Sequence, residues 1–177
     1  MWRASDTAHL FFDNCRVPKE NILGEPGQGS KIMLQTLDAG RLSIAAMGLG
    51  CAQGAYELAL SYAQERKQFG KSISQFQAIS FKLADMSIKI ELARTFLYKA
   101  CWLKDTHQPF TKEAAIAKLY CSEIAKEVAD AAVQVHGGNG LMKEYNVERF
   151  YRDQRLLQIG EGTSEILRMV IAKQIGI

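Results

Sequence analysis

Proline is scarce in this chain, and its placement constrains the fold more than any other feature. The sequence contains three prolines, Pro18, Pro26 and Pro109, so residues 27–108 and 110–177 have none. Inside a helix, proline removes a backbone hydrogen bond and clashes with the preceding turn. Both proline-free stretches therefore leave room for very long helices.

Apolar residues recur at alternating steps of three and four through both stretches, as they do on one face of a helix. The first such stripe runs from Leu34 to Tyr62 and is interrupted by one charged residue, Arg41. A Gly137–Gly140 cluster stops the third stripe, because glycine adopts the left-handed conformation that a helix end prefers. The pattern predicts helices over residues 30–66, 76–100, 111–136, 146–153 and 163–174, the third with Thr111 as its N-cap.

Three long helices and two short ones, joined by short loops, predict an all-α fold built as an antiparallel helical bundle. Six small residues on the first helix would let a neighbouring helix approach closely: Ala45, Ala46, Gly48, Gly50, Ala52 and Gly54. Residues 1–26 differ, because His9–Phe12 has the composition of a short strand and Pro18 holds the chain extended. A lone strand cannot form a sheet, so this segment is either a hairpin on the bundle or the end of a sheet whose other strands lie elsewhere.

The composition excludes several classes of protein. The net charge is +3 and the charges are interspersed, which argues against nucleic acid and an anionic membrane surface as partners. The longest uncharged stretch, Leu42–Tyr56, is shorter than the roughly 18 apolar residues of a membrane-spanning helix. Four separated cysteines and three isolated histidines lack zinc-ligand spacing, so we expect no metal site and a compartment that keeps cysteines reduced.

A carboxylate between two glycines is the first candidate for chemistry. Glu161 lies within Gly160–Gly162, where no neighbouring side chain shields it and a ligand can approach the backbone closely. Such a residue can serve as a general base when an apolar ligand covers it. It can equally be an acidic residue near a helix N-terminus, where the helix dipole favours negative charge.

Three further segments have two interpretations each. Arg66 and Lys67 can hold a phosphate, or they are the cations that commonly end a helix. Gln134–Gly140 can turn backbone amides toward a phosphate or a ring, or it is a plain helix stop, and no strand precedes it as a dinucleotide fingerprint requires. Arg41 either forms a structural ion pair with Asp38 or lines an internal polar site.

Five motifs stand in a fixed order along the chain. They are Arg16–Gly24, Arg66–Gly70 with Gln77, Gln134–Gly140, Glu148–Asp153 and Glu161–Ile166. In order and spacing they resemble the C-terminal helical domain of the acyl-CoA dehydrogenases, and Leu83–Met86 and Lys112–Ala115 look most similar to the short-chain, butyryl-type branch. The resemblance covers essentially the whole chain. It implies that residues 1–26 are the remnant of a middle β domain and that residues 27–177 form the helical domain.

The resemblance implies an FAD-dependent enzyme that makes a trans-2-enoyl-CoA from an acyl-CoA. Glu161 matches the base that takes the α-proton, and its main-chain N–H matches a donor to the thioester carbonyl. Asp38, Arg41 and Gly162 match substrate-side positions, which favours the polar-site interpretation of Arg41. Positions that match the FAD site, in part that of a neighbouring subunit, are Arg66, Gln68, Phe69, Phe76, Gln77, Gln134, His136, Gly137, Gly138, Thr163 and Glu165.

Two positions bear on variation within the family. Some branches, such as the isovaleryl type, place the base immediately before the arginine of the first helix, where this chain has Gly40, so that alternative is excluded here. Gly160 stands where many short- and medium-chain members have tyrosine, which leaves the acyl-chain specificity open.

The resemblance further implies a homo-oligomer, dimer or tetramer, with FAD at the subunit interface, and an electron-transferring flavoprotein as electron acceptor. Bacterial cytoplasm and mitochondrial matrix fit equally well. We expect the isolated chain to be inactive, because the other wall of the flavin site lies outside it. Two alternatives remain open: a flavoenzyme of the acyl-CoA oxidase or nitroalkane-oxidase kind, and a non-catalytic helical oligomerisation module.

Overall fold

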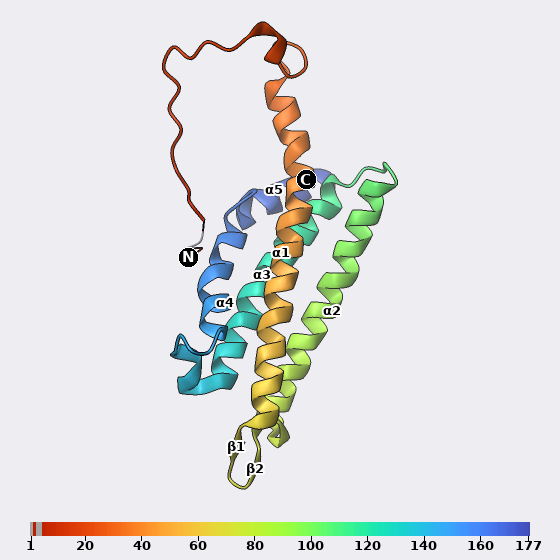
Figure 1. Cartoon of the computed structure of the whole chain (residues 1–177). Coiled ribbons are helices and arrows are strands. Elements are labelled where there is room, and N and C mark those ends of the chain that lie inside the picture. The colour runs from red at the N-terminus through yellow and green to blue at the C-terminus, as the bar shows by residue number, and fades with distance from the viewer. Residues whose placement is uncertain (1, 3–4) are drawn as a thin grey trace.

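A computed structural model describes residue 2 and residues 5–177 of the chain, and it confirms the all-α bundle (Figure 1). The described residues form five α-helices: α1 (Gly29–Glu65), α2 (Gln77–Asp105), α3 (Thr111–His136), α4 (Val147–Asp153) and α5 (Ser164–Gln174). Single 3-10 turns occupy Lys19–Asn21, Ile73–Gln75, Gly137–Leu141 and Gln154–Gln158. All five helices lie where the apolar spacing predicts them, and α2 continues to Asp105.

The long helices α1, α2 and α3 lie side by side, and the chain reverses direction between them (Figure 1). After α1, β1 (Lys67–Gln68) pairs antiparallel with β2 (Lys71–Ser72). Phe69 and Gly70 between these strands have φ angles of 52° and 83°, and two successive positive φ angles are typical of a tight hairpin turn. As a result, α2 runs antiparallel to both α1 and α3, and the hairpin projects beyond the end of the bundle.

Small residues on α1 let its neighbours approach closely. A side-chain carbon added at Gly48 would lie 2.8 Å from the carbonyl oxygen of Cys121 on α3, which is too close for any real contact. One added at Gly54 would lie 2.8 Å from the ring of Phe150 on α4, whereas one added at Gly50 would meet open space. The predicted close packing is therefore confirmed at Gly48 and Gly54 but not at Gly50.

Gly48→Ala and Gly50→Ala are expected to change the stability in opposite directions. Replacing glycine by alanine inside a helix stabilises it by up to about 1 kcal/mol, and Gly50→Ala has the space to do so. Gly48→Ala forces the backbone of α3 outward, and overpacking of this kind costs roughly 1–3 kcal/mol. Urea denaturation of the chain and both variants measures the free energy of unfolding. Equal stabilities for the two variants would contradict the close approach at Gly48.

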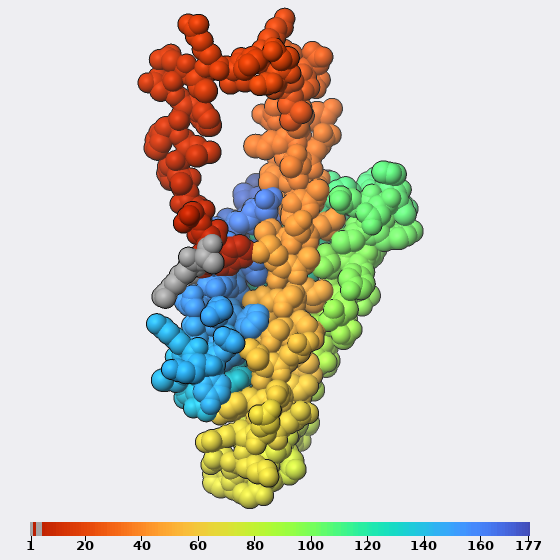
Figure 2. Space-filling view, viewed as in Figure 1, coloured from red at the N-terminus to blue at the C-terminus, as the bar shows by residue number. Residues whose placement is uncertain are grey.

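The segment that precedes α1 stands clear of the bundle over most of its length (Figure 2). It is largely extended, as predicted, but the strand predicted at His9–Phe12 does not form, because no described residue pairs with it. Leu10, Phe11 and Phe12 are each at least 78% exposed. A strand without a partner leaves its backbone groups to water, so the strand prediction is wrong for this structure.

Thr111 begins α3 but does not cap it. Phe110 occupies the N-cap position, and it makes no side-chain hydrogen bond there. The Thr111 hydroxyl donates instead to Oδ2 of Asp38 on α1, at 2.6 Å. The predicted start of α3 is correct and the predicted cap is wrong, because the hydroxyl has a tertiary partner.

Candidate active site

Glu161 lies in a strained turn between the last 3-10 turn and α5. Its φ is 57° and that of Gly162 is 104°, so two successive residues are left-handed. Glycine tolerates this conformation, but for glutamate it is costly and persists only where contacts hold the turn. One such contact comes from Thr163, the N-cap of α5, whose side chain accepts the N–H of Ile166. The carboxylate is thus presented just before a helix N-terminus.

The turn places Glu161 against α1 at Gly40. A side-chain carbon added at Gly40 would lie 2.6 Å from Oε2 of Glu161, so glycine leaves the room that this carboxylate occupies. Both residues line a cleft of about 590 Å³. The rest of its lining is mainly apolar and consists of Leu23, Gly29, Ile32, Met33, Thr36, Leu37, Ala39, Ser43 and Lys104. The structure therefore brings the C-terminal motif and the first helix together around an apolar cleft that contains a carboxylate.

The buried Arg41 forms an ion pair with the half-buried Asp38 on α1. Nη1 of Arg41 donates to Oδ1 of Asp38 at 2.7 Å, and Arg41 is only 5% exposed. The structure therefore shows the Asp38 pairing, one of the two interpretations of Arg41 that the spacing left open. Neither side chain is among those that line the cleft, although Gly40 between them is. Nε of Arg41 is buried and has no hydrogen-bond partner among the described residues.

Lys118 on α3 is a residue of this site that the sequence interpretation misses. It is fully buried, and its Nζ donates to the carbonyl oxygen of Gly162 at 2.6 Å. Burial, and secondarily the charge of Arg41, lower the pKa of Lys118 to about 8. A signal does exist in the sequence, because steps of four and three place Lys118 in line with Ala114 and Cys121, two small buried residues.

A second group of predicted residues meets at the opposite end of α1. Arg66 and Gln68 follow α1, His136 ends α3 and Gly137–Gly138 follows it, and together they line a hollow of about 410 Å³. Gly137 ends α3 with a φ of 59°, which confirms the predicted glycine stop. At 1.5 Å per helical residue, Gly40 and Arg66 are about 39 Å apart. The two groups therefore form separate sites.

His136 is largely enclosed by its neighbours. Its ring stacks on that of Tyr62 with 4.3 Å between centroids, and its Nδ1 lies 2.8 Å from the carbonyl oxygen of Ala132. Asn139 donates to the Tyr62 hydroxyl at 2.9 Å. With 6% of its surface exposed, His136 shapes the wall of the hollow and leaves little surface for a ligand.

Phe69, Phe76, Gln77 and Gln134 are not among the residues that line this hollow. Phe69 is 92% exposed at the hairpin tip, and its ring meets that of Phe76 edge to face at 6.1 Å. Gln77 begins α2 and Gln134 lies in the last turn of α3. All four therefore lie at the same end of the bundle as the hollow but outside its lining.

Thr163 and Glu165 line a third hollow, of about 590 Å³, at the N-terminus of α5. Glu123 on α3 anchors this region, because it accepts hydrogen bonds from Ser164 and Gln158, both at 2.7 Å. A hydrogen bond from its own main-chain N–H, together with one from Thr163, lowers the pKa of Glu165. The turn that carries Glu161 is thus fixed to α3 immediately after it.

Comparison with known proteins identifies the family. The profile described as "Acyl-CoA dehydrogenase, C-terminal domain" matches residues 27–176, nearly the whole chain. The chain belongs to the acyl-CoA dehydrogenase family.

Similar members of the family come from bacteria and animals. The chain is 58% identical over 173 residues to the probable acyl-CoA dehydrogenase YngJ of Bacillus subtilis, with 98% of the chain and 46% of that protein covered. It is 52% identical over 170 residues to the mitochondrial short-chain specific acyl-CoA dehydrogenase of Mus musculus, with 96% and 41% covered. The solved structure of butyryl-CoA dehydrogenase from Megasphaera elsdenii superposes with a TM-score of 0.89 at 49% identity, with 90% and 42% covered. The chain thus spans less than half the length of these relatives.

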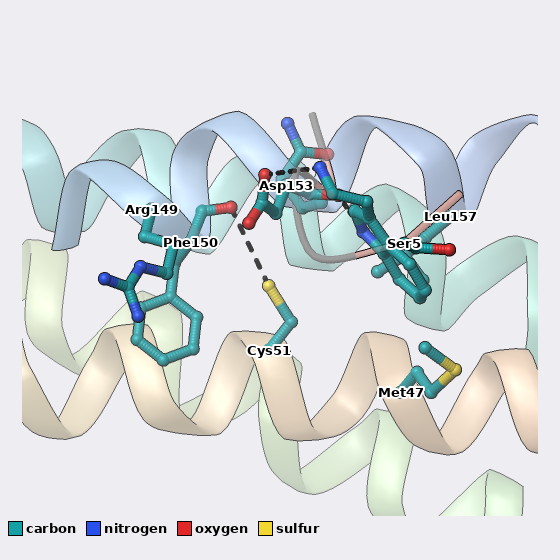
Figure 3. Close-up of a pocket in the computed structure, with 9 residues that line it drawn as sticks. Ser5, Met47, Cys51, Arg149, Phe150, Asp153 and Leu157 are labelled. Carbon is teal, nitrogen blue, oxygen red and sulfur yellow. Dashed lines mark hydrogen bonds between the residues drawn. The ribbon is translucent and has the colours of Figure 1, made fainter. Parts of the chain in front are cut away.

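This acyl-CoA dehydrogenase chain also has a hollow of about 480 Å³ that none of the predicted site residues lines (Figure 3). Trp2 closes it by donating from its main-chain nitrogen to Oδ1 of Asp153 at 2.8 Å and from its indole nitrogen to the Asp153 carbonyl at 2.7 Å. Cys51 faces the carbonyl of Phe150, and burial raises the pKa of this thiol to about 11. The thiol stays protonated at neutral pH, which makes it a poor nucleophile.

Two absences hold for the part of the chain that the structure describes. No cluster of three or more histidine, cysteine, aspartate or glutamate side chains there is arranged to hold a metal ion. None of the helices described is both long and apolar enough to cross a membrane.

Proposed function

We propose that this chain forms the helical domain of an FAD-dependent acyl-CoA dehydrogenase that converts a short-chain acyl-CoA into a trans-2-enoyl-CoA. The observation that carries the proposal is the Glu161 carboxylate, held in a strained turn against Gly40 and lining an apolar cleft. The names of the mouse and Megasphaera elsdenii relatives support a short acyl chain. In this proposal residues 1–26 belong to a preceding β domain and residues 27–177 to the helical domain.

Glu161 acts as the base. Its carboxylate takes the α-proton of the acyl thioester, and its main-chain N–H donates to the thioester carbonyl, on which negative charge develops. Bound FAD would supply the acceptor for the hydride that leaves the β-carbon, so that two C–H bonds break and one C=C bond forms. Gly162 lies against the acyl group, and the apolar side chains of the cleft exclude water from it. Asp38 and Arg41 hold the Gly40 segment of α1 on the substrate side.

The donors at both ends of the bundle fit FAD. The Arg66 guanidinium and the Gln68 amide suit phosphate and ribose oxygens, and Gly137 and Gly138 have no side chain to block the approach of a ligand. Thr163 and Glu165 stand two and four residues after Glu161 and would face the reactive end of the cofactor. The FAD-binding set that we propose is Arg66, Gln68, Phe69, Phe76, Gln77, Gln134, His136, Gly137, Gly138, Thr163 and Glu165.

The spacing of the two ends supports a homo-oligomer with FAD at the subunit interface. The roughly 39 Å between Gly40 and Arg66 along α1 is longer than one FAD molecule, so a single FAD cannot contact both ends of one subunit. In this arrangement each bundle contacts two FAD molecules. An apolar stripe on the outside of α2 offers a contact surface for a second subunit, and its exposed members are Phe81, Ile88, Leu92, Tyr98 and Trp102.

The wider setting of the enzyme follows from the same proposal. An electron-transferring flavoprotein would serve as the electron acceptor of the FAD-loaded enzyme. The enzyme works in the bacterial cytoplasm or the mitochondrial matrix, and the family has members from Bacillus subtilis and mouse mitochondria.

Anaerobic mixing of butyryl-CoA with the FAD-loaded enzyme that contains this chain tests the proposed function. We expect the visible flavin absorbance to bleach and 2-enoyl-CoA to form in equal amount. If the protein binds FAD but none of the acyl-CoAs tested bleaches the flavin, the result would support the oligomerisation module instead. Rapid hydrogen peroxide production in air would support an oxidase.

A further inference from the structure

Lys118 is the most unusual buried group in the molecule. It is fully buried on α3, yet the acceptor of its Nζ is a main-chain carbonyl, that of Gly162 at 2.6 Å. Lysine is almost never fully buried unless it is paired, because its charge must leave water. A neutral carbonyl offsets that cost less well than a carboxylate would. The position therefore suggests a role in the site that contains Gly162.

The turn that Lys118 contacts is one that needs to be held. Glu161 and Gly162 have φ angles of 57° and 104°, and the glutamate backbone does not adopt this conformation unaided. After the turn, Ser164 is tied to Glu123 at 2.7 Å. Lys118 holds the Gly162 carbonyl from the interior, next to the catalytic carboxylate that we propose. The turn is therefore fixed from α3 on both sides of Thr163.

The charges around Lys118 come from three elements. Arg41 on α1, itself paired with Asp38, opposes its positive charge, whereas Glu123 on α3 and Glu161 in the turn favour it. Burial is the largest influence and lowers the pKa of Lys118 to about 8. At neutral pH the amine is mostly an ammonium, and its bond to Gly162 is charge-assisted. Above pH 8 it loses its proton and the bond weakens, since charge-assisted hydrogen bonds are the stronger kind.

We propose that Lys118 is a positioning residue: its buried amine holds the Gly162 carbonyl and thereby the left-handed turn that aims Glu161 at the cleft. This inference rests on the proposed function, in which Glu161 is the base. Lys118 does not touch the acyl group itself. It acts through the backbone on the direction of the Glu161 carboxylate.

Lys118→Met in the FAD-loaded enzyme tests the inference, because methionine has a similar length and no amine. Replacing a buried charge by an apolar residue of similar volume often leaves the fold intact, so we expect an unchanged or higher melting temperature and a full content of FAD. Bleaching by saturating butyryl-CoA should slow by about 10²-fold, the size of effect that misplacing a reacting group by about 1 Å has. The matched control is Lys112→Met, which removes a half-buried lysine of the same helix that pairs with Glu113 at 3.7 Å. This variant should bleach at the normal rate.

Two further measurements separate positioning from mere packing. Lys118→Gln keeps a hydrogen-bond donor without the charge, and it should recover part of the bleaching rate that Lys118→Met loses. The normal enzyme should bleach more slowly as the pH rises through about 8, the pKa of Lys118, whereas Lys118→Met should show no such fall. If Lys118→Met loses its FAD or its fold, Lys118→Gln takes its place in the comparison with the normal enzyme. A Lys118→Gln enzyme with the bleaching rate and the pH profile of the normal enzyme would overturn the inference.

The outcomes distinguish the inference from the proposed function. A Glu161→Gln enzyme that bleaches at the normal rate would overturn the role of Glu161 as the base. Lys118 would then have no base to position. If Glu161→Gln bleaches slowly and Lys118→Met bleaches at the normal rate, the role of Lys118 is overturned and that of Glu161 stands. Slow bleaching by both variants, with normal Lys112→Met, supports both.

Discussion

Glu161→Gln is expected to retain the fold and the yellow FAD but to lose substrate-dependent bleaching. A carboxamide has nearly the shape of a carboxylate but cannot take the α-proton, and general-base catalysis contributes roughly 10²–10⁴-fold to a rate. The contacts that hold the turn are made by Lys118 with the Gly162 carbonyl and by Thr163 with Ile166. None of them uses the Glu161 side chain, so the turn should persist. Stopped-flow absorbance after anaerobic mixing with butyryl-CoA measures the loss.

Glu144→Gln is the matched control for this experiment. Glu144 is an exposed glutamate in the loop before α4, and it lines none of the three hollows of the proposed site. The Glu144→Gln enzyme should bleach at the normal rate. A Glu161→Gln enzyme that binds FAD and bleaches as fast as Glu144→Gln would exclude Glu161 as the base.

The helices of this fold can be predicted from the sequence because their signals are local. Absence of proline, apolar spacing and the Gly137 stop each act within one element, and all of them are borne out. The hairpin after α1 escapes prediction, since its strands have two residues each and Phe69, a non-glycine residue, takes a positive φ in its turn. The strand at His9–Phe12 fails for the opposite reason: its composition favours a strand, but no described residue provides a partner.

The site is harder to predict, because its contacts join distant parts of the chain. Spacing on one helix allows the Asp38–Arg41 pair without choosing it over a polar site, and the structure shows the pair at 2.7 Å. A threonine hydroxyl is a suitable N-cap group, but the hydroxyl of Thr111 donates its hydrogen bond to Asp38 on another helix. Nothing local in the sequence brings Glu161 to Gly40, and only folding shows that a missing side chain on α1 makes room for the carboxylate. The only sign of Lys118 in the sequence is a charged residue in line with two small apolar residues of the same helix, Ala114 and Cys121.

Gly40→Ala is expected to raise stability and lower activity at the same time. Alanine is the better helix former, by up to about 1 kcal/mol. The atom that its methyl group would meet, at 2.6 Å, is Oε2 of Glu161, the movable end of a side chain and not part of the backbone. The helix can therefore accept the methyl group, but the carboxylate must shift by about an ångström, and a shift of that size can cost about 10²-fold in rate. We expect a higher melting temperature and slower bleaching by butyryl-CoA.

Gly50→Ala separates these two effects, because it makes the same change on the same helix in open space. It should gain stability as Gly40→Ala does and bleach at the normal rate. If Gly40→Ala also bleached at the normal rate, the contact between Gly40 and Glu161 would have no part in placing the base. The comparison therefore tests whether the missing side chain at Gly40 makes room for the Glu161 carboxylate or only affects the packing of α1. Packing alone predicts no difference in bleaching rate between the two variants.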